Sequence, residues 1–209
     1  MSAASLKPMS VKDYLHSEEA SAFRREYVGG FVYPLHGGTR AQNDTTQAGT
    51  TAGHVHIRRN ITAALDAAAM KAGCDLFQSD MKLRVQATDN FYYPDVMAVC
   101  YPDVMAVCGP QLPAGDATFV TSPCLLIEVT SKSTAQDDRR AKHAANTAIP
   151  SVQTYLIVEQ NVRRVTVYER ACERWTSADL ADQGTVALPC LGTTLTLNQV
   201  YRGMLPLDS

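Results

Sequence analysis

Several features that would place a protein in a special class are missing from this chain. Its 209 residues contain no apolar run near the ~20 residues that a membrane-spanning helix needs. The segment MSAASLKPMSVKDYLHSEE at the start has no apolar core, so we expect no secretory signal. Excess charge is also missing. A net charge of −2 and a pI near 6.2 argue against constitutive tight binding to nucleic acid, but they do not exclude a local basic cleft.

The cysteines lack the C-x-x-C spacing that is typical of many zinc sites. Six of them are scattered along the chain, at Cys74, Cys100, Cys108, Cys124, Cys172 and Cys190. We therefore do not expect a zinc site, and we interpret most of these residues as buried thiols in a reducing cytoplasm.

What the chain does contain is the composition of an ordinary globular protein. Hydrophobic residues make up 45% and charged residues 19% of the sequence. A chain of 209 residues fits one domain, here 1–209, and can bury roughly two-thirds of its unfolded surface. This balance is typical of an ordinary soluble globular protein.

The apolar pattern predicts a three-layer α/β/α sandwich around a mixed β-sheet. Ile57, Ile61 and Leu65 recur at helical spacing between His54 and Gly73. The run PCLLIEVTS at 123–131 is continuously apolar before its glutamate, as in a central strand covered on both faces. A second helix is expected from 133 to about 148, after a capping box in STAQ at 133–136. One long helix before and one after the central strand give the three layers.

Shorter elements are expected elsewhere along the chain. They are a helix at 11–22 capped by Ser10, a hairpin at 25–35 around Gly29-Gly30, a flexible loop at about 36–53, strands at 74–77, 81–87, 91–100, 151–159 and 163–170, and small strands followed by a short helix at 197–203.

An eight-residue duplication interrupts this pattern. YPDVMAVC occupies 93–100 and again 101–108, so two Pro-Asp pairs offer Asp95 and Asp103 for one position. Because eight is even, sliding the strand by one repeat keeps every side chain on its own face. With Asp103 in place, the preceding hairpin loop must hold about eight extra residues, at ~0.6 kcal/mol per doubling of loop length. We therefore predict that Asp95 occupies the site.

The acids at these positions indicate a chemistry. Glu128 follows four apolar residues, and a carboxylate there is costly unless it is paired or binds a metal. Mg²⁺ takes one or two carboxylates and keeps several waters. Lys142 lies on the following helix and brings positive charge. Two carboxylates, a metal that activates water and a lysine are what phosphodiester hydrolysis needs. A structural salt bridge is the alternative interpretation.

Two blocks of the sequence resemble a known family. SDMKLRV…FYYPDVMAVC and PCLLIEVTSKST…DRRAKHAANTAIPSVQTYLIVEQ are similar, in order and spacing, to the Uma-two family of restriction endonucleases within the PD-(D/E)xK nuclease superfamily. The similarity extends more weakly from about Val11 to Tyr201. It implies a restriction-endonuclease-like fold and a cytoplasmic, Mg²⁺- or Mn²⁺-dependent endonuclease whose substrate is nucleic acid, with DNA expected. The resemblance is also compatible with a homodimer that cuts both strands of a duplex.

The resemblance also implies roles for individual residues. Asp95 or Asp103 and Glu128 would bind the metal, with Glu26 as a further carboxylate on the metal side. The superfamily lysine that usually stands two residues after the second acid is replaced here by Thr130, and Lys142 matches a lysine displaced to the next helix.

The remaining candidates are one further residue that matches the family and several residues with an ordinary structural interpretation. His54 matches a family histidine at the start of the long helix, supported by Asn60. His54 and His56 are also compatible with exposed positions, and Lys82 and Lys132 are expected to be solvated.

Some features depart from an active enzyme. The loop at 36–53 is long, Ala145-Asn146 stands where relatives often have an aromatic residue, and the duplication enters the strand that carries the metal ligand. Two alternatives therefore stay open: a catalytically inactive nucleic-acid-binding or protein-interaction module of the same fold, and a remnant of a mobile element.

Overall fold

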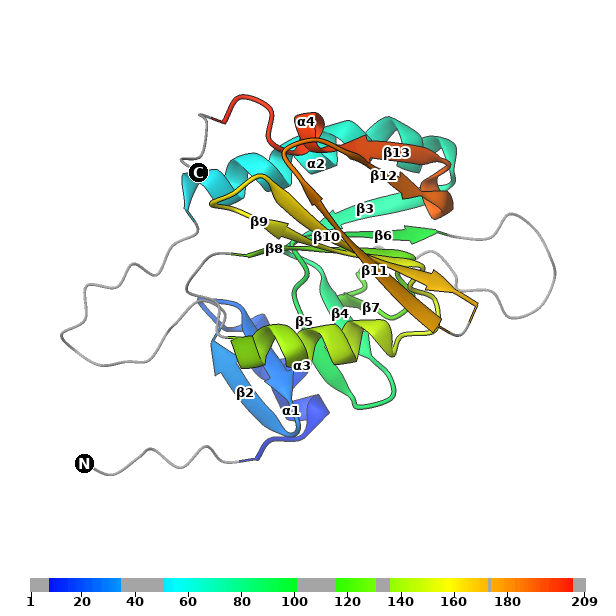
Figure 1. The fold of residues 1–209 in the computed structure, drawn as a ribbon. Helices are drawn as coiled ribbons and strands as arrows, with labels where there is room; N and C mark the ends of the chain where they lie inside the picture. The colour runs from blue at the N-terminus through cyan, green and yellow to red at the C-terminus, as the bar shows by residue number, and fades with distance from the viewer. Residues whose placement is uncertain (1–7, 35–50, 101–115, 131–135, 173, 205–209) are drawn as a thin grey trace.

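A computed structural model describes residues 8–34, 51–100, 116–130, 136–172 and 174–204 (Figure 1). Its central element is a six-stranded sheet in the order β11-β10-β9-β8-β6-β3. The strands are β3 (Cys74–Gln78), β6 (Val96–Cys100), β8 (Leu125–Thr130), β9 (Thr154–Glu159), β10 (Arg164–Ala171) and β11 (Arg174–Ala181). The sheet is mixed, because β8 and β9 are parallel while the other neighbours are antiparallel.

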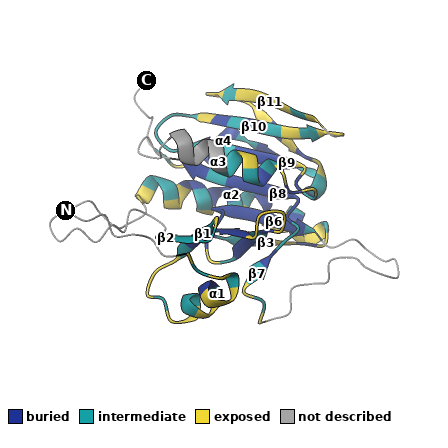
Figure 2. Ribbon diagram, turned by 90° about the horizontal axis from the view of Figure 1, so that it is seen from below, coloured by how far each residue is buried: buried dark blue, intermediate teal, exposed yellow. Residues whose placement is uncertain are grey.

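Two helices cover the two faces of this sheet, which confirms the predicted three-layer α/β architecture (Figure 1). Helix α2 (Ala52–Lys71) packs its apolar stripe on the same face as Val96 and Ala98. Helix α3 (Gln136–Thr147) lies on the other face, where Ala145 joins the cluster that contains Met97. Because side chains alternate along β6, they pack into two hydrophobic cores, one on each face of the sheet. Figure 2 shows strands β6 and β8 coloured largely as buried.

A second sheet, in the order β2-β1-β5-β4-β7, lies beside the first. It consists of β1 (Arg25–Val28), β2 (Phe31–Pro34), β4 (Lys82–Val85), β5 (Asn90–Tyr92) and β7 (Phe119–Val120). Helix α1 (Val11–Glu19) begins at Ser10, whose side chain accepts from the Asp13 N–H as predicted. Tyr14 of α1 stacks on Tyr27 at a centroid distance of 5.1 Å, which fixes this helix to the sheet.

The remaining elements form a small unit next to α2. They are β12 (Thr185–Leu188), the 3₁₀ helix η1 (Pro189–Leu191), β13 (Thr193–Thr196) and α4 (Leu197–Val200). Strands β12 and β13 pair only with each other, and their apolar residues join the core on the α2 side.

The segment 91–100 differs from the prediction of one strand. It forms two strands in different sheets, β5 and β6, separated by Tyr93, Pro94 and Asp95. Strand β4 pairs with β5, whereas β6 pairs with β3 and β8. Pro94 has no N–H to donate to a ladder, which is compatible with an end of pairing at this point. The chain therefore changes sheets immediately before Val96.

The start of α2 also differs from the prediction. The helix begins at Ala52, with Thr51 as its N-cap, so 51–53 do not belong to a flexible loop. Residues 35–50, the second repeat copy at 101–108 and the predicted capping box at Ser133 lie outside the described residues. In the part of the chain that the structure describes, no helix is long and apolar enough to cross a membrane.

For the cysteines of the described residues, the prediction that most are buried thiols is wrong. Cys74 and Cys100 are cross-strand neighbours in β3 and β6 and form a disulfide. Among the free cysteines of the described segments, Cys124 is buried, Cys190 is half-buried and Cys172 is exposed. The expectation that Lys82 is solvated is also wrong. Lys82 is buried, its Nζ donates to the Thr118 carbonyl oxygen, and burial lowers its pKa.

Candidate active site

Asp95 sits at the change of sheets and is held on both carboxylate oxygens. Its Oδ2 accepts from the Val129 backbone N–H at 2.8 Å, and its Oδ1 lies 2.6 Å from Nε2 of His54. Its own carbonyl oxygen accepts from the Ser79 N–H at 3.3 Å. Only 9% of the residue is exposed, so these bonds replace the water that a carboxylate otherwise requires. The side chain is thus fixed between β8 and α2.

The first turn of α2 positions His54. The Thr51 hydroxyl oxygen accepts from the His54 N–H, which caps the helix at this residue. Gly53 lets the turn approach the loop after β9, because a Cβ there would lie 3.3 Å from Cγ of Gln160. The positive end of the helix dipole also faces this region and favours a carboxylate such as Asp95.

Glu128 lies on β8, the strand that pairs with β6 directly after Asp95. Val96 of β6 is paired with Ile127 of β8 in an antiparallel ladder. Continuing this register by one residue places Asp95 opposite Glu128. Because side chains alternate along a strand, Glu128 takes the same face as Leu126, which belongs to the cluster on the α3 side. Glu128 is half-buried and takes part in interactions of its own.

Lys142 and Glu26 form an ion pair across the boundary between α3 and the second sheet. The Lys142 Nζ lies 2.9 Å from Oε1 of Glu26, and their side chains are 17% and 11% exposed. Tyr27 of β1 is paired with Phe91 of β5. The next step of that antiparallel register places Glu26 beside Tyr92, three residues before Asp95. The neighbour of Glu26 on β5 is therefore joined to Asp95 by a short stretch of backbone, from Tyr92 to Asp95.

Other predicted residues lie elsewhere. Asn60 does not support His54. It is buried under the C-terminal unit, where its Nδ2 donates to the carbonyl oxygens of Val200 and Arg202 at 3.0 and 2.8 Å. His56 is exposed, as its ordinary interpretation expected. Asp103 and Lys132 lie outside the described residues.

Arg58 is a candidate that the sequence interpretation missed. It lies one turn after His54 on α2, and its Nη1 donates to the Ser79 hydroxyl at 2.6 Å. Ser79 in turn donates its N–H to the Asp95 carbonyl, so Arg58 places a cation close to the Asp95 backbone. The signal in the sequence was the i, i+4 spacing from His54, which puts both residues on one side of the helix.

The donor set fits a hard divalent cation. Asp95 and Glu26 are buried carboxylates, and Glu128 is a half-buried carboxylate on β8, the strand whose Val129 N–H binds Asp95. Oxygen ligands of this kind suit Mg²⁺ and Mn²⁺, and Mg²⁺ needs only one or two protein carboxylates because it keeps its waters. The residues present are therefore compatible with a hard divalent cation.

Comparison with known proteins identifies the family. The family model Uma2, described as "Putative restriction endonuclease", matches residues 11–199. The chain belongs to the Uma2 family. Two uncharacterized Synechocystis proteins are similar to it: sll1609 is 28% identical over 86% of this chain and 92% of its own length, and slr1290 is 26% identical over 94% and 93%.

A solved structure supports the fold of this Uma2 protein. The crystal structure of a "putative nuclease belonging to DUF820" from Anabaena variabilis superposes with a TM-score of 0.64. The match covers 93% of this chain and 98% of that chain at 13% sequence identity. The likeness therefore extends over the α/β architecture as a whole.

Proposed function

We propose that this Uma2 protein is a metal-dependent endonuclease that hydrolyses phosphodiester bonds of nucleic acid, with DNA as the substrate and the cytoplasm as its location. The observation that carries the proposal is the placement of Asp95. A buried carboxylate stands at a break between two sheets, in contact with His54 and bound by the N–H of Val129, the residue after Glu128. A nuclease of this family needs paired acids at such a position, and a purely structural acid does not require the second one.

Each side chain has a separate role in this proposal. Asp95 and Glu128 hold Mg²⁺ or Mn²⁺, and Glu26 adds a carboxylate on the metal side. When bound, the metal supplies charge neutralisation at the phosphate and a more acidic water. His54 fixes the orientation of the Asp95 carboxylate through the 2.6 Å contact. Lys142 places its ammonium group where negative charge develops on the phosphate, and its contact with Glu26 pre-orients it.

A homodimer is part of the proposal because cleavage of both strands of a duplex needs two such sites. Sedimentation of the protein alone and with duplex DNA tests this independently of activity. A monomer that only nicks one strand would leave the hydrolytic proposal standing and remove the dimer.

Cleavage of supercoiled plasmid and of single-stranded DNA with Mg²⁺ or Mn²⁺ tests the function. The wild-type protein is expected to nick the plasmid, and Glu128→Ala and Asp95→Asn are expected to abolish nicking while the circular dichroism spectrum stays native. Equal background cleavage by wild type and Glu128→Ala, in protein shown to be folded, would overturn the proposal.

The duplication supplies an unusually well-matched control. Asp103→Asn makes the same chemical change in the same eight-residue context as Asp95→Asn, and we expect it to retain activity. Loss of activity in Asp103→Asn alone would instead assign the site to the second copy. Deleting either copy yields one and the same single-copy chain. Activity in that chain but not in the parent would identify the duplication as the damaging event, as in a mobile-element remnant.

A binding module of the same fold is the second candidate. The observation that favours it is that both Asp95 oxygens are already engaged by His54 and the Val129 N–H. A folded protein that shifts duplex DNA in a gel, binds no Mn²⁺ and leaves the DNA intact would support this module and exclude the enzyme.

A further inference from the structure

Four cysteines converge at the end of β6 remote from Asp95. Cys74 is the first residue of β3, Cys100 is the last residue of β6, Cys124 immediately precedes β8, and Cys190 lies in η1. The Sγ atoms of Cys100, Cys124 and Cys190 all lie within 4.8 Å of one another. Cys74 is bonded to Cys100, so its sulfur belongs to the same cluster. The sequence separates these residues by up to 116 positions.

The spacing of the sulfurs is close to that of a tetrahedral thiolate site. A zinc ion bound by four thiolates at about 2.3 Å holds its sulfurs about 3.8 Å apart. Here the Sγ atoms of Cys100 and Cys124 are 3.1 Å apart, and Cys190 lies within the 4.8 Å limit. Reduction of the Cys74–Cys100 bond frees these two sulfurs to move apart. The four sulfurs therefore belong to one compact group after reduction.

The surroundings suit a closed metal site that is screened from solvent. Cys74 and Cys124 are buried, and all four cysteines pack in or against the apolar core on the α2 side. The sulfur atoms of Cys124 and Cys190 lie within 4.8 Å of each other inside this screened region.

We propose that the reduced protein binds one Zn²⁺ ion through the thiolates of Cys74, Cys100, Cys124 and Cys190. A dithiol reductant supplies two electrons and two protons to the Cys74–Cys100 disulfide and becomes a disulfide itself. The metal then displaces the thiol protons to solvent, and the four sulfurs complete its coordination. Without reduction the disulfide sulfurs have no thiolate charge, so the oxidised protein does not form this site.

The proposed site has a structural role and is separate from the acidic one. It ties three strands of the central sheet to η1 and hence to the C-terminal unit. Thiolate ligands select Zn²⁺, whereas the carboxylates around Asp95 suit Mg²⁺ or Mn²⁺. The two sites lie at opposite ends of β6. The inference therefore does not depend on nuclease activity.

Titration of the reduced full-length protein with Co²⁺ as a spectroscopic probe tests the proposal. We expect one Co²⁺ per chain with the intense visible absorption of a tetrahedral thiolate complex, displaced by one equivalent of Zn²⁺. Cys190→Ser and Cys124→Ser should weaken binding by more than about tenfold, the least that even loss of a supporting contact costs. Protein with the disulfide intact should give no thiolate absorption.

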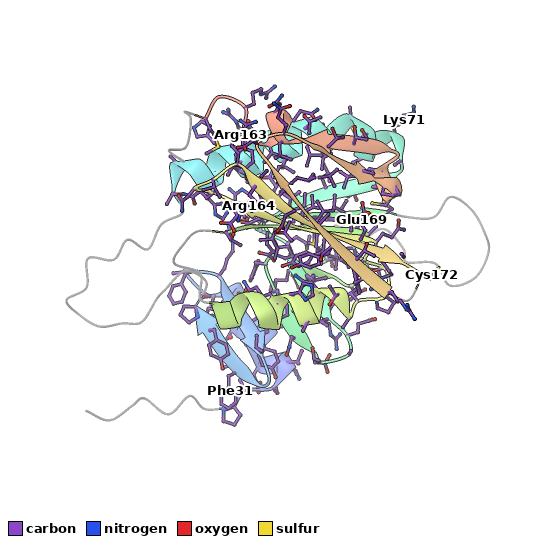
Figure 3. All side chains as sticks on the ribbon, viewed as in Figure 1. Phe31, Lys71, Arg163, Arg164, Glu169 and Cys172 are labelled. Atoms are coloured by element: carbon purple, nitrogen blue, oxygen red, sulfur yellow. A yellow bond between two sulfur atoms is a disulfide. The ribbon has the colours of Figure 1, made fainter. Side chains whose placement is uncertain are left out.

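Cys172→Ser is the matched control because Cys172 is exposed at the β10–β11 hairpin (Figure 3) and does not belong to the group of neighbouring sulfurs in the described residues. It should bind like the wild type. Cys190 is half-buried, so Cys190→Ser is the variant most compatible with a native fold if Cys124→Ser does not fold. Unchanged Co²⁺ spectra in folded Cys190→Ser would overturn the site. So would the absence of thiolate absorption in folded wild type whose six cysteines all titrate as free thiols.

Discussion

Replacing Lys142 with methionine removes the cation that faces the Glu26 carboxylate and leaves a chain of similar length. The pair is 2.9 Å apart, with side chains 17% and 11% exposed. Removing one partner of a buried pair costs about 3–5 kcal/mol because a charge stays in a poorly solvated position. Some water reaches this pair, and both side chains make further interactions. We therefore expect the lower end, about 3 kcal/mol of the free energy of unfolding.

Urea and thermal unfolding measure this loss. For a protein of this size, about 3 kcal/mol corresponds to a fall in Tm of about 6–12 °C. The double variant Glu26→Gln/Lys142→Met removes both charges and should return to within about 1 kcal/mol of the wild type. Lys12→Met, at an exposed position on α1, should change stability by less than about 0.5 kcal/mol.

The same variants separate stability from catalysis. At a temperature where all are folded, Lys142→Met should cut plasmid about 10²–10³-fold more slowly, as expected for loss of a group that stabilises transition-state charge. The double variant should regain stability but not cleavage. A loss below about 1 kcal/mol in Lys142→Met would refute the view that this pair fastens α3 to β1. Recovery of cleavage in the double variant would refute the catalytic role of the lysine.

Three further predictions follow from individual contacts. His143 packs on Tyr168, and burial lowers its pKa. As the pH falls, this histidine is therefore protonated in the unfolded chain before it is protonated in the folded protein. The wild type should therefore lose stability relative to His143→Phe as the pH falls below about 6.5. Tm measured from about pH 8 to pH 5 tests this, and parallel plots of Tm against pH for the two proteins would contradict it. Asn60→Ala removes the donor to two carbonyl oxygens and should cost about 2–3 kcal/mol in urea unfolding, whereas a change below about 0.5 kcal/mol would show that water replaces it. Gly53→Ala should leave Tm nearly unchanged, because the higher helix propensity of alanine, about 1 kcal/mol, offsets the close contact of its Cβ with Gln160. The variant should still cut more slowly, because the Cβ presses on Gln160. Adding Gln160→Ala should restore the rate, and a rate that stays low would exclude this contact as the cause.

Much of the fold followed from local patterns. Ile57, Ile61 and Leu65 recur at helical spacing, which places their side chains on one face of α2. The structure buries all three. The continuous apolar run before Glu128 predicted a strand covered on both faces, and β8 has α2 on one side and α3 on the other. These features depend on near neighbours in the chain, so a single sequence contains them.

The errors arose where the pairing of distant segments decides the structure. The apolar stretch 91–100 carries no local signal of which sheet each half joins, apart from Pro94. Lys82 looks like a solvated lysine in sequence, yet the strands packed around it bury its stem. Asn60 shares a helix with His54 but contacts the C-terminal unit instead. In each case the deciding neighbour lies far away along the chain.

By itself, the sequence determined the α/β class, the acids and lysine of the candidate site, and the two equivalent aspartates of the duplication. Only the tertiary structure decided which side chains meet: His54 with Asp95, Lys142 with Glu26, and Cys74 and Cys100 with Cys124 and Cys190. The physical reason is that periodicity fixes the face on which a residue lies, whereas strand register and helix packing bring faces from distant segments together.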